Sequence, residues 1–473
     1  MADTLRTFNI KGLNLKVNPF LQENGELLRA VNVDTTIIGS KVKRPGYSKL
    51  LGTPENSTVT SLFDWHRANG TQFWLYRMAA GKLYYSTQGT GAWTICGNGT
   101  FTAGGHLGYA VLEDTMIVGD GTANTRHTTD GTSFSDTSGA PKASTFAEFN
   151  QRIWASGTSS LMFYSTTGTP TDWASDSSSV RIPGAGNVNL LFKQNNRLVA
   201  TKNSQLVFKY DGVNLFDLAT QEGASSPYSL GNREDYRFWL NRNGVQLFDG
   251  VKPQLQSSAI DPLIVNSLGS GIVGTQFDNA PGVVHRNDYF VTLGTVTDDF
   301  TGETIQNATL KYNLQTNEYL VWSTFHMPTA WHSYVDENRR QQLIFGGTGG
   351  QVWQFDLNSG TVQADDGNPI EVQMMGVLNY GQPEADKEFI WTQAFFNPGA
   401  QAKIQTAIAD TYTKGKLNWF DVGDVVDGLA EYRFPEDANT GKLRFWKIYE
   451  ASRSAPFRFF GFSDTVNFKP NPT

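Results

Sequence analysis

Cysteine, charged residues and long apolar runs are all scarce in this chain of 473 residues. The single cysteine, Cys96, excludes an internal disulfide, and a lone cysteine is more often a small buried hydrophobe than a nucleophile. Charged residues make up only 18% of the chain and the formal net charge is −7, which argues against a general nucleic-acid-binding surface. A mildly acidic wall past which DNA slides is compatible with this charge.

Targeting and membrane-spanning signals are also missing. The first ten residues, MADTLRTFNI, contain no basic region followed by an apolar run, and no stretch of about 18 apolar residues occurs anywhere. We therefore expect a soluble product that is made in a cytoplasm and inserts into no membrane.

The motifs of catalysis and metal binding are absent as well. The histidines are scattered, without HExxH or a His/Cys pair at metal-ligand spacing, and no Walker loop, GxGxxG-helix unit or GxSxG elbow occurs. We predict no catalytic, cofactor-binding or metal-binding residue, and no enzyme activity. The histidines, each expected to be a packed or surface residue, are His66, His106, His127, His285, His326 and His332.

Aromatic residues and glycines, in contrast, are plentiful. Aromatics make up 13% of the chain and there are 47 glycines, a composition that suits many short strands joined by tight turns. Residues 150–175 show the pattern, with apolar bursts at 153–155 and 161–164, a turn of small residues between them, and a Gly/Thr/Pro turn closing on Trp173. The sequence therefore predicts an all-β fold.

The same pattern repeats from Thr58 onward, at intervals of about 37 to 53 residues, the length of a four-stranded propeller blade. Most of the aligned strands follow a polar turn, and we interpret them as the inner strands of blades. The repeat predicts a β-propeller of about seven blades over 58–369, with six or eight as alternatives. The aligned strands begin at Phe73, Met116, Ile153, Leu198, Phe238, Phe290 and Leu343.

Three turns resemble Asp-box hairpins, in which a short polar side chain caps the turn and an aromatic residue packs beneath it. Such boxes occur in sialidases, but their role is architectural. The turns are 86–89 before Trp93, 128–131 before Phe134 and 165–168 before Trp173.

A glycosidase would need two carboxylates facing each other across a sugar, and a sialidase would also need three converging arginines. Carboxylates and arginines do flank the aligned strands, where they could line a mouth, although acidic residues at blade edges are common in any propeller. The candidates are Asp235, Asp288 and Glu337, with Arg77, Arg152, Arg197, Arg237 and Arg286.

The two ends of the chain have a different pattern from the repeat. Residues 1–57 predict strands and a hairpin that close or flank the propeller, and the basic cluster Lys41, Lys43 and Arg44 could meet DNA or an acidic neighbour, although a solvated hairpin face is the commoner interpretation. Residues 370–473 have longer strands with cleaner alternation, which predicts an antiparallel β-sandwich.

Two further segments are rich in acidic residues. Asp421, Asp424 and Asp427 have a spacing of three, which lacks the alternate-residue oxygens of a calcium loop and favours an exposed loop. The connection 296–310, with Asp298, Asp299 and Glu303, is longer than its equivalents and is either a contact to a neighbour or an ordinary surface hairpin. In the same way, the run GGTGG at 346–350 is expected to be a hairpin turn.

Several short motifs resemble virion proteins of tailed bacteriophages. The opening pattern GLN, NPF, AVNVD and KRPGY is similar to the segment by which such proteins enter a propeller, and Arg152-Ile153-Trp154, Phe163-Tyr164-Ser165 and PTDW at 170–173 are similar to one of their blades. The stretches FWKIY at 445–449 and PFRF at 456–459 resemble their terminal sandwich strands. These motifs extend, in order, over nearly the full chain.

The resemblance implies the tail hub or nozzle of short-tailed phages, also called the DNA-stabilisation or tail tubular protein. It further implies a structural virion protein of the tail that forms a homohexameric ring below the portal and adaptor. This ring would contact tail fibre or needle proteins, continue the DNA channel and serve DNA retention and ejection. A receptor-binding or glycan-hydrolysing tail propeller is the alternative. A free secreted lectin-like propeller would require a signal sequence, which is absent.

Overall fold

The computed structural model describes residues 4–469, apart from 37, 53–55, 69, 71, 88, 175–177, 220, 265–273, 299–301, 360, 411–416, 437–438 and 454. Strands account for almost all of its regular structure. The described helical segments are η1 (Pro227–Ser229), η2 (Ser257–Ile260), α1 (Asp261–Ile264) and α2 (Gly274–Asn279), and none of the described helices is long and apolar enough to cross a bilayer. The prediction of an all-β chain is confirmed.

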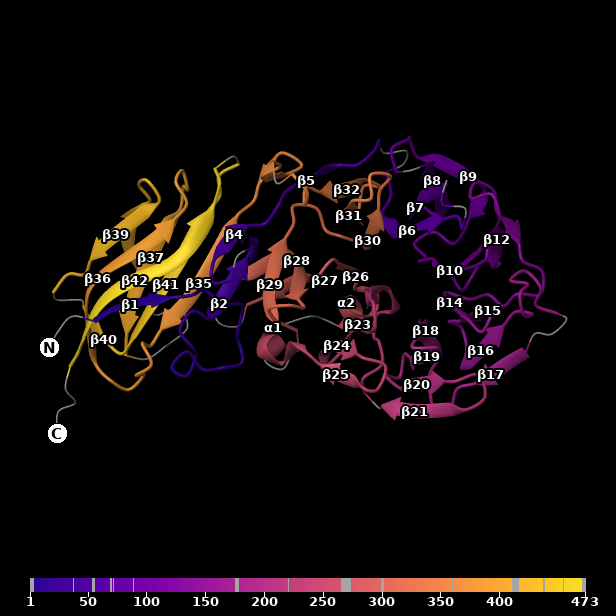
Figure 1. Ribbon diagram of the computed structural model, residues 1–473, viewed down its shortest axis with the longest axis horizontal. Coiled ribbons are helices and arrows are strands. Elements are labelled where there is room, and N and C mark those ends of the chain that lie inside the picture. The colour runs from indigo at the N-terminus through magenta and orange to yellow at the C-terminus, as the bar shows by residue number, and fades with distance from the viewer. Residues whose placement is uncertain are drawn as a thin grey trace.

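Five successive stretches each fold into a four-stranded antiparallel sheet in which the strands pair in chain order. Figure 1 shows these sheets side by side around a ring, with the first strand of each nearest the middle, which is a propeller-like arrangement. The sheets are β6 (Val59–His66), β7 (Phe73–Ala79), β8 (Lys82–Thr87) and β9 (Thr94–Thr100); β10 (Gly108–Leu112), β11 (Thr115–Gly119), β12 (Arg126–Thr128) and β13 (Ser135–Asp136); β14 (Thr145–Phe149), β15 (Arg152–Ser156), β16 (Leu161–Tyr164) and β17 (Ser178–Arg181); β18 (Val188–Gln194), β19 (Arg197–Lys202), β20 (Val207–Tyr210) and β21 (Leu215–Ala219); and β22 (Gly231–Arg233), β23 (Tyr236–Asn241), β24 (Gly244–Phe248) and β25 (Pro253–Leu255).

The strands that the sequence repeat aligned are the second strands of their sheets, so their interpretation as inner strands is wrong. Phe73 begins β7 and Ile153 lies in β15, whereas the inner positions belong to β6 and β14. A second strand has a neighbour on each side within its sheet and a packed sheet against each face. Every residue of β7 is therefore buried, and its mostly apolar run, interrupted only by Arg77, is what made these strands conspicuous in the sequence.

Two larger sheets complete the ring. The sheet that begins with β26 (Gly282–His285), β27 (Asp288–Thr297), β28 (Thr304–Asn313) and β29 (Glu318–Ser323) continues beyond the ring, as described below. The last sheet takes a strand from the N-terminal segment, because β5 pairs with β32 and joins the two ends of the ring. It contains β30 (Ala330–Val335), β31 (Gln341–Gly346), β32 (Val352–Phe355), β5 (Tyr47–Lys49), β33 (Ala364–Asp365) and β34 (Asn368–Pro369), and the predicted turn at 346–350 connects β31 to β32.

One nine-stranded sheet runs from the ring into the C-terminal part of the chain. Its connecting strand is β2 (Leu27–Val31), which lies between β29, to which it is parallel, and β35, to which it is antiparallel. Figure 1 shows β2 between the ring and the C-terminal strands. Beyond β2 the sheet contains β35 (Val372–Leu378), β41 (Leu443–Glu450), β37 (Lys403–Ala409) and β38 (Phe420–Asp424).

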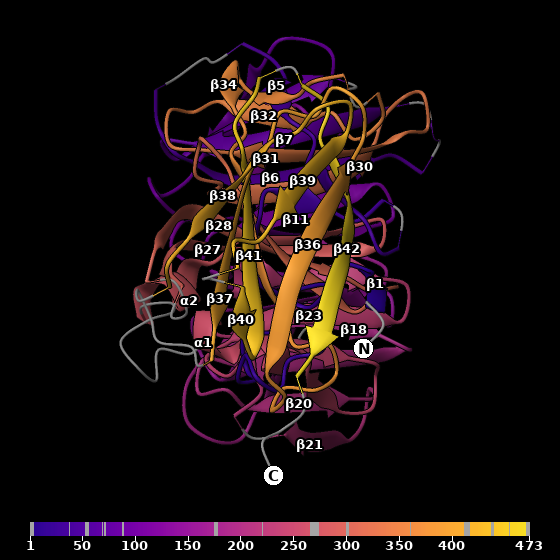
Figure 2. The same cartoon turned by 90° about the vertical axis from the view of Figure 1, so that its left-hand side faces the viewer.

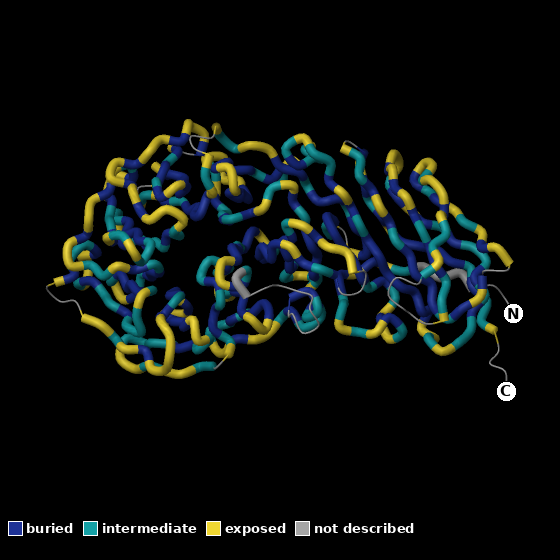
Figure 3. Tube along the Cα trace, turned by 180° about the vertical axis from the view of Figure 1, so that it is seen from behind, coloured by how far each residue is buried: buried dark blue, intermediate teal, exposed yellow. Residues whose placement is uncertain are grey.

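A seven-stranded sheet packs against this C-terminal half of the nine-stranded sheet. The two sheets share one core cluster, in which Ile404 and Trp446 of the first meet Phe389, Phe459 and Phe462 of the second. Figure 2 shows β36 and β42 lying beside β41 and β37, and Figure 3 shows many buried residues along the C-terminal strands. The strands are β1 (Thr4–Phe8), β3 (Val33–Asp34), β4 (Lys41–Lys43), β36 (Lys387–Phe396), β39 (Leu429–Arg433), β40 (Thr440–Gly441) and β42 (Arg458–Phe468).

The Asp-box-like turn at 128–131 has the predicted capping. Asp130 Oδ1 accepts the backbone N–H groups of Thr132 and Ser133, Thr128 Oγ1 accepts that of Gly131, and Phe134 is buried beneath the turn. In the two related turns Trp93 and Trp173 are also buried, while residue 88 lies outside the described part of the chain.

Candidate functional site

The basic cluster of the N-terminal segment is buried, so the prediction of a solvated face is wrong. Lys41, Lys43 and Arg44 are at most 6% exposed, and each meets a carboxylate of the same chain. These carboxylates come from β29, from β41 and from β33, so the cluster fastens the N-terminal segment to the ring and to the C-terminal sheets and presents no surface to DNA. The pairs are Lys41–Glu318 at 3.1 Å, Lys43–Glu450 at 2.6 Å and Arg44–Asp365 at 2.5 Å.

The long connection between β27 and β28 also contacts the chain itself. Asp298 lies 3.0 Å from Arg29 of β2, and Glu303 lies 3.4 Å from the same guanidinium. Arg29 and Asp298 are almost fully buried, which makes this a contact across the junction rather than a surface hairpin alone. Asp299 lies outside the described residues.

The five arginines considered for a sialidase site do not converge. None of them lines the cavity in the middle of the ring among the described residues. Arg77 is fully buried, donates to the Gly350 carbonyl and lies over Tyr84 and Trp93. The others have partners in their own neighbourhoods: Arg152 lies over Tyr164, Arg197 donates to the Asn196 carbonyl, Arg237 to the Glu234 carbonyl and Arg286 to the Asn358 side chain.

The three candidate carboxylates do not form a glycosidase pair in that cavity either. Asp288 is paired with Lys311, 3.1 Å away, and accepts a hydrogen bond from Asn313. Burial raises the pKa of Asp288, while Lys311 acts in the opposite direction. Asp235 and Glu337 are exposed in turns of two other sheets, and none of the three carboxylates is among the described residues that line the cavity.

The cavity in the middle of the ring has a volume of about 530 Å³ and is lined mainly by the first strands of the sheets. It is obstructed by an aromatic contact, because the ring of His106, before β10, stacks on the ring of Tyr228, before β22, with centroids 3.8 Å apart. These two sheets lie three positions apart around the ring, so the contact spans its middle. Burial lowers the pKa of His106 to about 4, which keeps the imidazole neutral in this contact.

The structure also brings two histidines to one carboxylate of the cavity wall. Asp64 accepts hydrogen bonds from Nε2 of His66 and from Nε2 of His332, both at 2.8 Å. Burial would raise the pKa of Asp64, but the charges and hydrogen bonds of His332 and His66 outweigh it and hold the pKa well below its usual range. The hydrogen bond to Asp64 in turn raises the pKa of His66.

No group of three or more metal-ligating side chains occurs among the residues that the structure describes. Cys96 is buried at 3% exposure, as predicted, and burial raises the pKa of its thiol. The acidic segment is only partly a loop, because Asp421 and Asp424 belong to the edge strand β38 and Asp421 accepts a hydrogen bond from Gln405.

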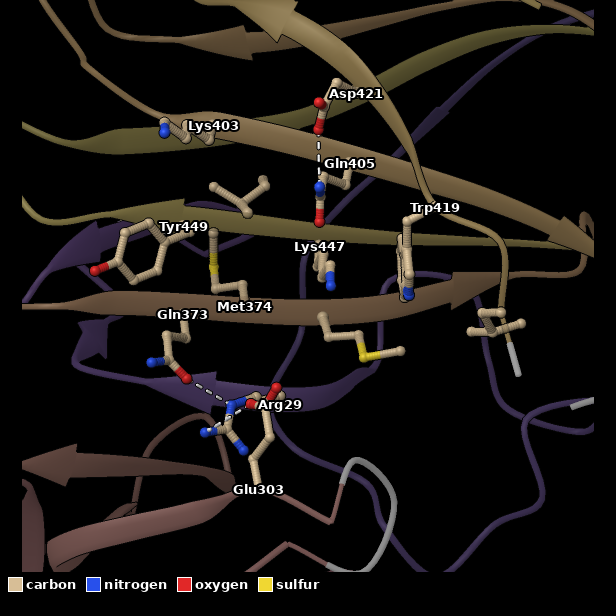
Figure 4. A pocket seen from close by; sticks show the side chains of 13 residues that line it. Arg29, Glu303, Gln373, Met374, Lys403, Gln405, Trp419, Asp421, Lys447 and Tyr449 are labelled. Atoms are coloured by element: carbon tan, nitrogen blue, oxygen red, sulfur yellow. Dashed lines mark hydrogen bonds and ion pairs between the residues drawn. The ribbon is translucent and has the colours of Figure 1, made fainter. Parts of the chain in front are cut away.

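A second cavity of about 530 Å³ is a groove on the outer face of the nine-stranded sheet, shown in Figure 4. Strand register explains its layout, because side chains two residues apart on a strand share a face. Tyr449 of β41 lies between Gln373 of β35 and Lys403 of β37. The next row is Arg29, Met375, Lys447, Gln405 and Asp421, contributed by β2, β35, β41, β37 and β38.

The charges in the groove are unevenly satisfied. Arg29 is paired with Asp298 and Glu303, whereas no ion pair joins Lys403 or Lys447 to a carboxylate within the described residues. The Lys447 ammonium lies 4.3 Å from the centre of the Trp419 ring, a cation–π contact. Burial lowers the pKa of Lys447, although Glu303 and Asp421 act in the opposite direction.

Sequence reasoning missed both groupings. Asp64 and His332 are 268 residues apart and meet only because the ring closes. The groove residues are dispersed over five strands, and only the alternation of the C-terminal strands indicated which side chains share a face.

No family model matches the chain, and no curated protein matches it either. Among solved structures, the computationally designed Ika8 protein shares 13% identity over 65% of this chain and 99% of its own, with a TM-score of 0.40. BamB from Moraxella catarrhalis shares 12% identity over 75% of this chain and 98% of its own, with a TM-score of 0.39. YCF48 bound to D1 peptide shares 13% identity over 67% of this chain and 99% of its own, with a TM-score of 0.41.

Proposed function

We propose that the ring is a seven-bladed propeller and that the C-terminal part is a β-sandwich. The five four-stranded sheets supply five blades, β26 to β29 supply a sixth, and β30 to β32 with β5 supply a seventh that joins the two ends of the ring. The core shared by the seven-stranded and nine-stranded sheets supports a sandwich.

We further propose that the protein is a structural subunit of a phage tail, a hub or nozzle that forms a homohexameric ring below the portal and adaptor and helps retain and release the genome. The observation that carries this proposal is the nine-stranded sheet, which continues without a break from the ring into the C-terminal part. The link from β2 to β29 is the register pair Val31–Val321, and the backbone N–H groups of Leu13 and Asn32 also donate to the carbonyls of Tyr319 and Val321. These bonds, together with buried ion pairs at the same junction, resist bending between the two parts. A rigid subunit suits a homo-oligomeric ring built from heterologous interfaces, because such a ring closes only if every subunit is rotated by the same angle relative to its neighbour.

Buried ion pairs strengthen the same junction. The Arg44–Asp365 and Lys43–Glu450 pairs join the N-terminal segment to the last sheet of the ring and to β41, and all four side chains are at most 3% exposed. The resemblance of the short sequence motifs to those of phage virion proteins suggests the biological setting for this subunit.

In this proposal the DNA conduit lies between subunits rather than through the middle of each propeller. The His106–Tyr228 stack leaves no passage for a duplex there, and the cavity has a volume of only about 530 Å³. The net charge of −7 suits a wall past which DNA slides without adhering.

Electron microscopy of particles from an infected host in which this gene is silenced tests the proposal, with complementation by the intact gene as the control. We expect heads that package DNA and then lose it, with truncated tails. Full, complete-looking particles that fail to adsorb would contradict the proposal and favour a receptor-binding protein.

A further inference from the structure

The groove of Figure 4 has the side-chain chemistry of a binding site, and the proposed role as a tail hub subunit does not use it. One end of the groove is formed by Tyr449, which is 40% exposed and lies between Gln373 and Lys403 on the neighbouring strands. A hydrogen-bonding amide and an ammonium therefore lie on either side of an accessible aromatic ring, since adjacent strands are spaced by about 4.8 Å.

The second row of the groove offers both donors and acceptors. Lys447 can donate, and Gln405 and Asp421, which are hydrogen-bonded to each other, keep a second amide N–H and a second carboxylate oxygen for a ligand. Met375 supplies an apolar floor and is 5% exposed. Figure 4 shows Trp419 and Tyr449 at opposite ends of the groove with Lys447 between them.

We propose that this groove binds an acidic saccharide, with a sugar ring stacked on Tyr449 and separate sugar carboxylates held by Lys403 and by Lys447. A polyol needs donors and acceptors side by side, and the groove provides both together with aromatic walls. Lys403 and Lys447 have no ion pair with a carboxylate among the described residues, so they remain available to an anion. The volume of about 530 Å³ is within the usual range for ligand sites.

Two other ligand classes fit less well. A polyphosphate carries more negative charge per unit length than a chain of sugar carboxylates, so the carboxylates of Asp421 and Glu303 in the lining would repel it more strongly. An extended peptide would add to a free strand edge, but the groove lies on the face of a sheet, where the backbone of β35, β41 and β37 is already paired on both sides.

Trp419 has a positioning role in this arrangement. Its ring meets the Lys447 ammonium at 4.3 Å and holds the amine beside the groove. This contact explains how a partly desolvated lysine is retained without a carboxylate within ion-pair distance in the described part of the chain.

Calorimetric titration of the purified full chain with trigalacturonate, and in parallel with neutral maltotriose, tests the proposal. We expect binding of trigalacturonate and much weaker binding of maltotriose. Tyr449→Ala and the double variant Lys403→Gln/Lys447→Gln should each weaken trigalacturonate binding roughly tenfold or more, because each lost charged hydrogen bond or stacking contact contributes on the order of 1.4 kcal/mol.

Matched controls separate the groove from general effects. Tyr236→Ala removes a tyrosine of similar exposure, 44%, from a sheet of the propeller-like part, and Lys252→Gln removes an exposed lysine from the same part. Both should bind trigalacturonate like the unmodified chain. The proposal is overturned if trigalacturonate does not bind, if the groove variants bind it unchanged, or if a tetraglutamate peptide binds equally well. None of these results bears on whether the subunits assemble into the proposed homohexamer.

Discussion

Replacing Asp365 by alanine should destabilise the protein strongly, because it leaves the Arg44 guanidinium buried without its counter-charge. Arg44 is 0% exposed and donates to both carboxylate oxygens of Asp365, at 2.7 and 2.5 Å. Its remaining donors are occupied by Asn32 Oδ1 and by the carbonyls of Pro45 and Ser323, which hold the charge in place. The side chain is therefore unable to reach water without disrupting the junction.

Breaking a buried pair of this kind costs about 3 to 5 kcal/mol. With a urea slope of about 3 kcal/mol per molar, the unfolding midpoint should fall by about 1 to 1.7 M. Urea titration followed by tryptophan fluorescence measures this directly, since Trp322 and Trp353 are buried near the pair.

Two control variants show whether the loss of stability comes from an unpaired buried charge. Glu148→Ala removes a partly exposed partner of Lys193 at 2.7 Å and should cost only about 0.2 to 1 kcal/mol. Arg44→Met with Asp365→Leu removes both charges and should cost less than Asp365→Ala alone. A midpoint for Asp365→Ala equal to that of Glu148→Ala would refute the reasoning.

Two further predictions concern pH and the thiol. Burial lowers the pKa of His106 and His285 to about 4, so both are neutral in the fold and the unfolded chain binds more protons below about pH 6.5. The stability that these two neutral histidines contribute is therefore fully present above pH 6.5 and is lost as the pH falls towards 4, by up to about 1.4 kcal/mol per pH unit for each histidine. As the pH is lowered over this range, the melting temperature of His285→Gln should fall less steeply than that of the unmodified chain, and equal slopes would contradict this. Cys96, with a raised pKa and 3% exposure, should react with a thiol reagent only when denaturant unfolds the protein, and immediate labelling of the native chain would show otherwise.

The local sequence pattern located strands correctly where the strand is recognisable from its own apolar residues. The apolar bursts at Phe73 and Ile153 located two strands, because a strand packed on both faces must be mostly apolar. The same signal could not show that these are second strands, since the inner strands are less uniformly apolar and pairing order is a tertiary property.

The basic cluster shows where local pattern misleads. Lys41, Lys43 and Arg44 resemble a solvated hairpin face in the sequence, and nothing nearby reveals partners that are 277 to 407 residues away. The partners are supplied by β29, β41 and β33, which come together only when both ends of the chain pack at the junction.

Composition and periodicity by themselves determined the all-β class, the repeated strand-turn-strand pattern and the burial of Cys96, because each depends on residue type and short-range spacing. Tertiary structure alone decided the continuous nine-stranded sheet, the His106–Tyr228 stack and the row of side chains around Tyr449. Strand pairing and ring closure bring together residues from distant segments, and the energy of those contacts depends on burial that no local window of sequence contains.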